Sequence, residues 1–423
     1  MLPPLPADAE RAADALSAAA RDAIRVLAGA SSADKDRALR DGAAGLRAAE
    51  TRLLAANAED LERGRAAGES AAFLDRLTLN PARIEAMARG LEEIAALPDP
   101  VGETIAAWRR PNGLEIDQVR VPIGVVLTIY ESRPNVTADS AALCLKTANA
   151  VLLKGGSESQ ATSGAIADVL RTAVAGAGLP EAAVQLVSGG RDVVRGLLRR
   201  DDRIDVVIAR GGEALKRTIM AESRIPVVKH FEGICHLYVD AAADLAMAER
   251  ICLNGKVQRP SVCNALENLV VHEAVAPRFL PRMVAQLREH GCEVRGDAAV
   301  RAIVADVVPA TDADWDTEYL DLVLSVKVVP SLDVALDFIA AHGTQLAEAI
   351  VTDDYRAAER FLHTVDAAAV YVNASTRFTD GYEFGFGAEV GISTNRLHAR
   401  GPMGLRELTT YKYCVRGSGQ VRA

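Results

Sequence analysis

Short, continuous apolar runs alternate with helical patterns from Val119 onward, and this alternation constrains the fold more than any other feature of the chain. The runs AVLLKGG, VQLVSGG and IDVVIARGG each predict a strand, and a helical pattern follows each of them. Strands of this kind are typical of a parallel sheet that helices cover on both faces. Such open sheets bind ligands at the carboxyl ends of their strands. The pattern therefore predicts a nucleotide-binding domain over roughly 120–240.

The same alternation continues in the second half of the chain. ENLVVHE and LVLSVKVV predict strands, and APRFLPRMVAQLREHG and SLDVALDFIAAHG predict helices. Residues 8–97 instead predict successive helices, because apolar residues recur there at three- and four-residue spacing. We therefore expect an α/β fold with two doubly wound parallel-sheet domains. The expected divisions are 1–240 for the helices and the cofactor domain, 241–371 for a second domain, and 372–423 for a return segment.

Charge and composition exclude several classes of function. A net charge of −9 disfavours non-specific nucleic-acid binding, which depends on neutralising phosphates. No run of about 18 apolar residues predicts a membrane span. The six cysteines form no CxxC pair and the seven histidines form no HxH or HExxH, so we expect no metal site. The N-terminus MLPPLPADAERAADAL lacks a secretory signal pattern, so we expect a cytoplasmic protein with free thiols.

Three of the predicted strands end in small polar turns, which begin Lys154-Gly-Gly-Ser, Ser188-Gly-Gly and Arg210-Gly-Gly-Glu. Glycines in such turns let backbone amides approach phosphates at helix N-termini. Each turn alone also fits the ordinary loops of any α/β protein. No GxGxxG fingerprint follows an early strand, which disfavours a Rossmann dehydrogenase of the common kind.

Cys263 is the cysteine whose surroundings favour chemistry. A lone cysteine is more often a small buried hydrophobic residue, and the other five keep that interpretation. Cys263 lies in the polar string QRPSVCNA, after a Pro that breaks the preceding helix. Lys256 and Arg259 lie nearby in the sequence, and positive charge favours the nucleophilic thiolate.

Asn135 follows Pro134 directly after the first strand of the predicted cofactor domain. An Asn after Pro is usually a turn residue. At the carboxyl end of a strand, its side-chain N–H is also able to stabilise an oxyanion.

Three segments, in this order, resemble the aldehyde dehydrogenase superfamily. They are ESRPNVTADSAALCLKTANAVLLKGGSES, QRPSVCNA and EFGFGAEVGISTNRLHARGPMGLRELTTYKY, and the last is the most specific. The resemblance covers essentially the whole chain and implies that superfamily's fold with a small β flap. It also implies the branch that reduces an acyl phosphate. We expect NADPH-dependent reduction of L-glutamyl 5-phosphate to L-glutamate 5-semialdehyde and phosphate, the second step of proline biosynthesis from glutamate.

The resemblance also implies roles for individual residues. Cys263 matches the catalytic thiol, and Asn135 matches the residue that forms the oxyanion hole with the backbone N–H of the cysteine. In this family, attack by the thiol leads to a thioester.

The cofactor NADP (NADPH) is expected on the same basis. Lys154 matches the lysine that contacts the adenosine ribose and, in NADP users, its phosphate. Gly211 and Gly212 occupy the place of the turn on the pyrophosphate side. Glu318 resembles the carboxylate that holds the nicotinamide ribose, although the usual flanking Phe-Gly-Pro is absent.

One segment departs from the superfamily. Members that oxidise aldehydes carry a general-base Glu in a Glu-Leu-Gly-Gly-Lys string, and the matching stretch here, Lys229–His236, is about two residues shorter. Glu232 therefore cannot be assigned the role of that general base. An ungapped match puts His230 at the position of the general-base Glu. For His230 and His236 we expect structural hydrogen bonds. Loss of the base that activates water agrees with a reductase, which must avoid hydrolysing its thioester.

The expected substrate carries a carboxylate, an ammonium group and a phosphate. Ser375, Thr376 and Arg377 follow the strand pattern AVYVNAS, where the family closes its substrate mouth. Arg377 is the candidate for the α-carboxylate because its fork matches carboxylate geometry. Arg133 and Arg259 are candidates for the phosphate, and a surface salt bridge is an equally good interpretation of each arginine.

Partners follow from the same resemblance. The Asn-Gly pair in 110–121 predicts a hairpin, and the tail GLRELTTYKYCVRG predicts a terminal strand. In the family, these elements form an oligomerisation flap, so we expect a dimer or larger homo-oligomer. Association with glutamate 5-kinase follows from pathway logic alone. Two alternatives stay open: an aldehyde dehydrogenase that makes a free acid, and a catalytically silent scaffold protein.

Overall fold

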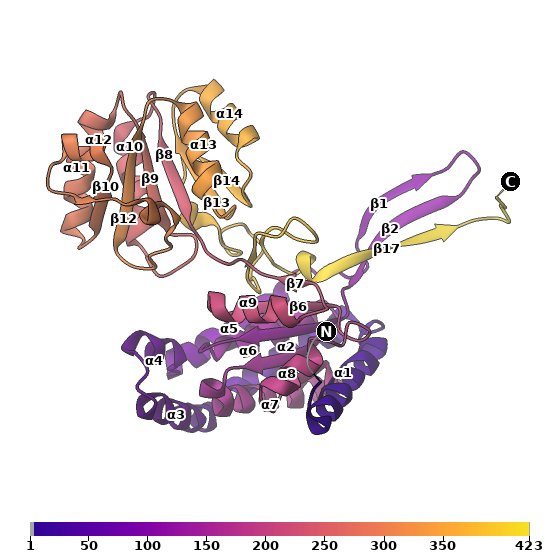
Figure 1. The fold of residues 1–423 in the computed structure, drawn as a ribbon. Coiled ribbons are helices and arrows are strands. Elements are labelled where there is room, and N and C mark those ends of the chain that lie inside the picture. The colour runs from indigo at the N-terminus through magenta and orange to yellow at the C-terminus, as the bar shows by residue number, and fades with distance from the viewer. Residues whose placement is uncertain (1–3, 423) are drawn as a thin grey trace. The chain divides into compact units, whose positions relative to one another are not determined.

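The computed structural model describes residues 4–422 of the chain, and these form two compact units (Figure 1). The first unit extends to Lys229 and also includes Gly385–Gly391 and the chain from Met403 onward. The second unit comprises His230–Phe384 and Ile392–Pro402. The second unit thus begins at His230 rather than at the expected 241, and the expected return segment is shared between the units. The reason is that the strand Cys235–Val239 pairs within the second sheet.

The N-terminal helices form a scaffold on the first unit. Ser31 begins the second helix as its N-cap, because its Oγ accepts a hydrogen bond from Asp34 N at 3.1 Å. The buried positions of these helices are mostly Ala and Leu, which allows close helix packing. The helices are α1 (Ala7–Leu27), α2 (Ser32–Ala48), α3 (Glu50–Ala66), α4 (Ala71–Leu77) and α5 (Pro81–Ala96).

The first unit contains a parallel sheet with the order β5-β4-β3-β6-β7. The chain leaves β3 towards β4 on one side and later returns to place β6 on the other side. The carboxyl ends of β3 and β6 therefore mark a topological switch point, where open α/β sheets bind ligands. The strands are β3 (Val125–Tyr130), β4 (Ala150–Gly155), β5 (Val184–Leu186), β6 (Val206–Arg210) and β7 (Val227–Val228). The helices are α6 (Asn135–Lys146), α7 (Gln160–Gly176), α8 (Arg191–Leu197) and α9 (Glu213–Glu222).

The second unit contains another parallel sheet, with the order β11-β10-β12-β9-β8-β13-β14. The strands are β8 (Cys235–Val239), β9 (Leu266–His272), β10 (Glu293–Gly296), β11 (Val308–Pro309), β12 (Val323–Val329), β13 (Ala347–Val351) and β14 (Ala369–Val372). The helices are α10 (Leu245–Val257), α11 (Ala276–Glu289), α12 (Ala298–Ile303), α13 (Leu332–His342) and α14 (Tyr355–Thr364). Two short strands, β15 (Ile392–Ser393) and β16 (Gly401–Pro402), pair with each other.

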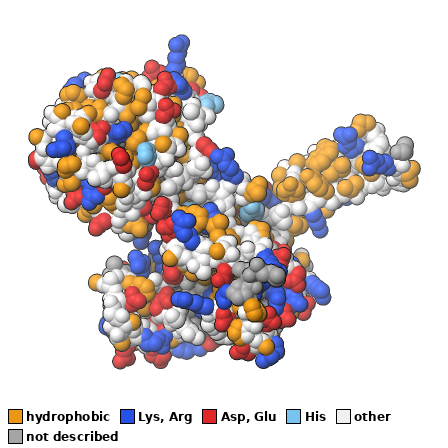
Figure 2. Space-filling view, in the orientation of Figure 1, with side chains coloured by type: hydrophobic (Ala, Val, Ile, Leu, Met, Phe, Trp, Pro, Cys, Tyr) orange, Lys and Arg blue, Asp and Glu red, His pale blue; other side chains and the backbone are white. Residues whose placement is uncertain are grey.

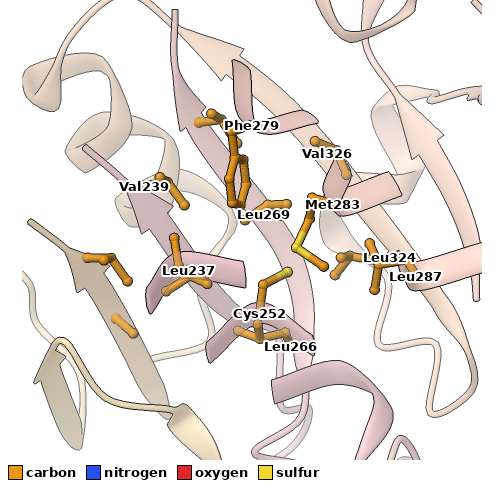
Figure 3. Close-up of a cluster of buried hydrophobic side chains, with 14 of the residues drawn as sticks. Leu237, Val239, Cys252, Leu266, Leu269, Phe279, Met283, Leu287, Leu324 and Val326 are labelled. Carbon is orange, nitrogen blue, oxygen red and sulfur yellow. The ribbon is translucent and has the colours of Figure 1, made fainter. Parts of the chain in front are cut away.

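Figure 3 shows the core between this second sheet and its helices. Phe279 and Met283 of α11 point toward Leu269 of β9 and Leu324 of β12, and all four side chains are buried. Cys252 of α10 lies in the same cluster, so this cysteine is a core residue, as expected. The core holds the amino ends of β8, β9 and β12 in fixed register, and the site described below lies just before these ends.

A three-stranded antiparallel sheet forms an arm of the first unit, with β2 between β1 and β17. Its strands are β1 (Thr104–Arg109), β2 (Glu115–Pro122) and β17 (Thr409–Arg416). The hairpin begins at Thr104, before the expected 110–121, and Gly113 takes a positive φ of 89° in its turn. The two parallel sheets and this arm confirm the predicted fold class. Within residues 4–422, no helix is both long and apolar enough to cross a membrane.

Candidate active site

Cys263 lies half-buried in the loop between α10 and β9. The next residue, Asn264, is buried and fixed from three directions. Its Nδ2 donates to the carbonyl of Thr379 at 2.8 Å, and Thr376 Oγ1 donates to its carbonyl at 2.8 Å. Arg377 Nη1 donates to its Oδ1. The backbone that carries the candidate nucleophile is therefore held rigidly by the segment after β14.

Gly233 connects Cys263 to Glu318. The backbone N–H of Gly233 donates to Glu318 Oε1 at 2.9 Å. A Cβ at position 233 would overlap the carbonyl oxygen of Cys263, so only glycine allows this close packing. Cys235 Sγ donates to the same carbonyl oxygen at 3.4 Å. The second unit thus brings the candidate thiol and the candidate ribose carboxylate to one place, although they are far apart in the sequence.

Arg377 supplies positive charge to this place. Burial lowers the pKa of its guanidinium, the positive charge of Arg259 lowers it further, and Asp380 and Cys263 oppose both effects. Arg377 Nε also donates to Gln258 Oε1 at 2.9 Å. The guanidinium groups of Arg259 and Arg377 therefore lie close enough to influence each other electrostatically, and Cys263 interacts with Arg377. Positive charge at this place favours an anionic ligand or a thiolate.

Lys256 forms a buried ion pair next to the loop that carries Cys263. Its ammonium group is fully buried and lies 2.6 Å from Glu267 Oε2, which is also fully buried. Glu267 Oε1 accepts a hydrogen bond from Leu320 N at 3.3 Å. Burial raises the pKa of Glu267 to about 7, and Lys256 opposes that rise. Lys256 thus forms an ion pair with Glu267, and Arg259 and Arg377 add positive charge near the thiol.

Ser375 and Thr376 are both buried and use their hydroxyl groups within the protein. Ser375 Oγ accepts a hydrogen bond from Arg377 N at 3.3 Å and caps the short 3-10 helix Thr376–Phe378. Thr376 holds the carbonyl of Asn264. In the structure, Thr376 thus positions Asn264, and Ser375 positions Arg377. Sequence reasoning missed Asn264 and Gly233. Asn264 follows Cys263 directly in the sequence, whereas only the structure shows that Gly233 lies against Cys263.

Asn135 is the first residue of α6 in the first unit, directly beyond β3. Its side chain is exposed, and its Nδ2 donates to Asp139 Oδ2 at 3.0 Å. Arg133 is exposed in the preceding loop, and its carbonyl accepts a hydrogen bond from Val136 N at 3.0 Å. Both residues therefore lie at the switch point of the first sheet.

The turn after β6 already binds an anionic group. The backbone N–H of Gly212, the N-cap of α9, donates to Glu131 Oε2 at 2.8 Å. A Cβ on Gly211 would lie 2.5 Å from the same carboxylate oxygen. The absence of a side chain at 211 and the helix N-terminus thus form a cradle for an anionic oxygen.

Lys154 lies at the end of β4, and its Nζ donates to the carbonyl of Gly155 at 2.9 Å. Partial burial lowers the pKa of Lys154, and the negative charge of Glu158 opposes this. Glu158 Oε1 in turn accepts a hydrogen bond from Ser132 N at 2.7 Å. The ammonium group is therefore held near the loops that follow β3 and β4.

Comparison with known proteins shows which family this chain belongs to. The sequence profile described as the aldehyde dehydrogenase family matches residues 4–297. A γ-glutamyl phosphate reductase of Moorella thermoacetica is 56% identical over 404 residues, covering 95% of this chain and 97% of that protein. The chain belongs to the aldehyde dehydrogenase family.

Solved structures agree with this membership. The crystal structure of γ-glutamyl phosphate reductase from Thermotoga maritima is 46% identical, has a TM-score of 0.95, and covers 97% of this chain and 100% of that chain. An engineered glycolyl-CoA reductase with bound NADP⁺ is 14% identical, has a TM-score of 0.65, and covers 95% of this chain and 96% of that chain. The second likeness shows the fold alone. Membership of the family implies a nicotinamide cofactor.

The segment that departs from the aldehyde-oxidising members of the family forms structural hydrogen bonds. His230 Nδ1 lies 2.9 Å from the carbonyl of Ile392. His236 is buried in β8, where its Nδ1 lies 2.9 Å from Glu348 Oε2 and its Nε2 lies 3.2 Å from Asn268 Nδ2. The expectation of hydrogen-bonding histidines is confirmed.

Proposed function

We propose that this chain catalyses the NADPH-dependent reduction of L-glutamyl 5-phosphate to L-glutamate 5-semialdehyde and phosphate, the second step of proline biosynthesis from glutamate. Relatives named γ-glutamyl phosphate reductase match nearly the whole chain at high identity. The observation that carries the proposal is the Cys263 loop, which Asn264 holds rigidly beside Gly233 and Glu318.

In the first step, the Cys263 thiolate attacks the γ-carbonyl carbon of the acyl phosphate and forms a sulfur–carbon bond. The oxyanion that develops is held by the Asn135 side chain and by the backbone N–H of Cys263. The tetrahedral species then collapses, the carbon–oxygen bond to phosphate breaks, and phosphate leaves. The product is a thioester on Cys263, which accepts hydride far more readily than a carboxylate does.

The residues of the chain fit a nicotinamide cofactor. NADPH, when bound, would supply a hydride to the thioester carbonyl. The carbon–sulfur bond then breaks, which releases the semialdehyde and regenerates the Cys263 thiolate. Gly211 and Gly212 would hold its pyrophosphate, since the turn already donates to a carboxylate oxygen. Lys154 would contact the adenosine ribose and its 2′-phosphate, which favours NADP over NAD. Glu318 would hold the nicotinamide ribose, and Gly233 fixes that carboxylate beside Cys263.

The substrate anions have arginine partners in this proposal. Arg377 binds the α-carboxylate, because Asn264 and Gln258 orient its planar fork. Arg259 and Arg133 bind the phosphate. Ser375 and Thr376 contribute at the substrate mouth by supporting Arg377 and the backbone of Asn264.

Oxidation of an aldehyde to a free acid is the second candidate reaction. It needs a base that activates water against the thioester. The shortened stretch around His230 and Glu232 lacks the Glu-Leu-Gly-Gly-Lys string, and the Nδ1 of His230 is engaged with a backbone carbonyl. These features favour transfer of the acyl group of the Cys263 thioester to phosphate rather than to water.

The arm supports a proposal of homo-oligomers. Figure 2 shows hydrophobic side chains gathered along it. Trp108, Tyr411 and Tyr413 are exposed there, and the Tyr413 ring contacts the rings of the other two. We propose a dimer or larger assembly through this arm, a cytoplasmic location, and association with glutamate 5-kinase, whose acyl phosphate product is labile.

The test is the reverse reaction, measured as NADP reduction by glutamate semialdehyde plus phosphate. We expect turnover to require phosphate and to be faster with NADP than with NAD. Cys263→Ala should abolish turnover and leave NADP binding intact, whereas Cys414→Ala, which changes a half-buried thiol on the arm, should keep wild-type rates. Phosphate-independent formation of a free acid, or normal turnover by Cys263→Ala, would refute the proposal.

A further inference from the structure

The side-chain amide of Asn135 has two different ends, and only its N–H end stabilises an oxyanion. The two ends have nearly the same shape, so packing alone does not select between them. A hydrogen bond does select, because Nδ2 donates to Asp139 Oδ2 at 3.0 Å. Asp139 lies four residues later on α6, where the side chains of one helix face meet.

We propose that Asp139 is a positioning residue, which orients the Asn135 amide so that one N–H stays directed at the reacting carbonyl oxygen. This inference rests on the proposed function, since it requires Asn135 to stabilise the oxyanion. An ionised carboxylate only accepts hydrogen bonds, so it holds Nδ2 and repels Oδ1. One Nδ2 hydrogen is used by Asp139, and the second remains for the oxyanion.

The surroundings of Asp139 suit an ionised carboxylate at the pH of an enzyme assay. Asp139 is half-buried. Burial raises its pKa to about 6, while the hydrogen bond from Asn135 and the positive charge of Arg210 oppose the rise. At pH 8 the group is therefore mostly ionised and acts as an acceptor only.

The start of α6 has anchors that do not involve Asp139. Tyr130 Oη and Thr137 Oγ1 share a hydrogen bond of 2.6 Å, and Thr137 Oγ1 donates to Ser163 Oγ at 3.2 Å. All three side chains are buried. A variant at Asp139 is therefore expected to keep the helix in place and to lose only the orientation of Asn135.

A double-mutant cycle tests this role at pH 8 with saturating substrates in the reverse assay. Asn135→Ala should lower kcat by about 10²–10³-fold, as removal of one oxyanion donor does. Asp139→Leu should lower kcat by roughly fivefold, because the Asn135 side chain then distributes over its three χ1 rotamers as well as over both amide orientations. Asp139→Asn should fall between wild type and Asp139→Leu, since an amide partner permits either orientation. The KM for NADP should stay unchanged, and Ser140→Ala on the same helix serves as the matched control.

The decisive measurement is the double variant. If Asp139 acts through Asn135, then Asp139→Leu should cause no further loss of kcat in the Asn135→Ala background, whereas a merely structural role would persist there. Additive losses would overturn the inference, and so would wild-type kcat in Asp139→Leu when Asn135→Ala is impaired. Wild-type kcat in Asn135→Ala would instead refute the oxyanion role itself. Should Asp139→Leu fail to fold, the near-isosteric Asp139→Asn carries the same cycle.

Discussion

At the residue scale, the proposed preference for NADP rests on the charge of a single side chain. Lys154 lies at the end of β4 with a partly buried ammonium group, so its charge acts in surroundings that screen it less than water does. At the same scale, the structure pairs Lys256 with Glu267, a contact that the sequence did not indicate. Proximity in the sequence therefore does not identify the closest electrostatic partner of a charged residue, because the tertiary structure decides where the side chain points.

Lys154→Met should raise the KM for NADPH selectively. The lost charge-assisted contact corresponds to about 1.5–3 kcal/mol, or roughly ten- to hundredfold. The KM for NADH should change little, because NADH lacks the 2′-phosphate. Steady-state kinetics with both cofactors measure this difference, with Lys412→Met on the exposed arm as the control. An unchanged preference for NADPH over NADH would contradict a contact between Lys154 and the 2′-phosphate.

At the scale of elements, α10 and β9 are joined by a buried ion pair below the loop that carries Cys263. Lys256 belongs to α10 and Glu267 to β9, and neither side chain is exposed to solvent. Breaking a buried pair leaves one charge without compensation, whereas replacing both members with apolar groups is often neutral. The pair therefore links the position of α10 to that of the strand.

Lys256→Met should destabilise the fold by about 3–5 kcal/mol, and the double variant Lys256→Met with Glu267→Leu should recover most of that loss. Unfolding in urea measures both effects. The matched comparison is Lys327→Met, which changes a lysine of β12 that lies over the Trp315 ring. A double variant as unstable as Lys256→Met would show that the loss does not come from the uncompensated carboxylate.

The raised pKa of Glu267 also predicts how this pair responds to pH. Its pKa rises from 4.5 to about 7, so the folded state binds this proton more tightly than the unfolded state does. The contribution of Glu267 to the free energy of unfolding should therefore fall as the pH rises from 4.5 to 7. The double variant, which lacks this carboxyl group, should lose that part of the pH dependence.

At the scale of the whole molecule, the arm exposes aromatic side chains and open strand edges to solvent. Tyr411 and Tyr413 of β17 and Trp108 of β1 are each at least two-fifths exposed, and β1 and β17 are both edge strands. Exposed apolar patches and open strand edges are typical of interaction sites.

Trp108→Lys combined with Tyr413→Lys should prevent the proposed assembly and leave monomers, because the two lysine charges would have to lose their hydration at an interface on the arm. Sedimentation velocity measures the mass of the wild type and the variant. Tyr355→Lys is the control, since Tyr355 is exposed on α14 of the second unit. A variant that keeps the wild-type mass would contradict assembly through the arm.

The sequence by itself determined the α/β class and most of the longer helices and strands, because a local periodicity of apolar residues marks such elements. It did not mark the strands β1 and β10 or the helix α12, which are short or exposed. The strings around Cys263 and Asn135 likewise indicated their family. Only the tertiary structure decided which side chains meet. It paired Lys256 with Glu267, placed Gly233 against the carbonyl of Cys263, and added the strand β8 to the second sheet. Such contacts depend on the packing of segments that are distant in the chain, and no local pattern of residues encodes that packing.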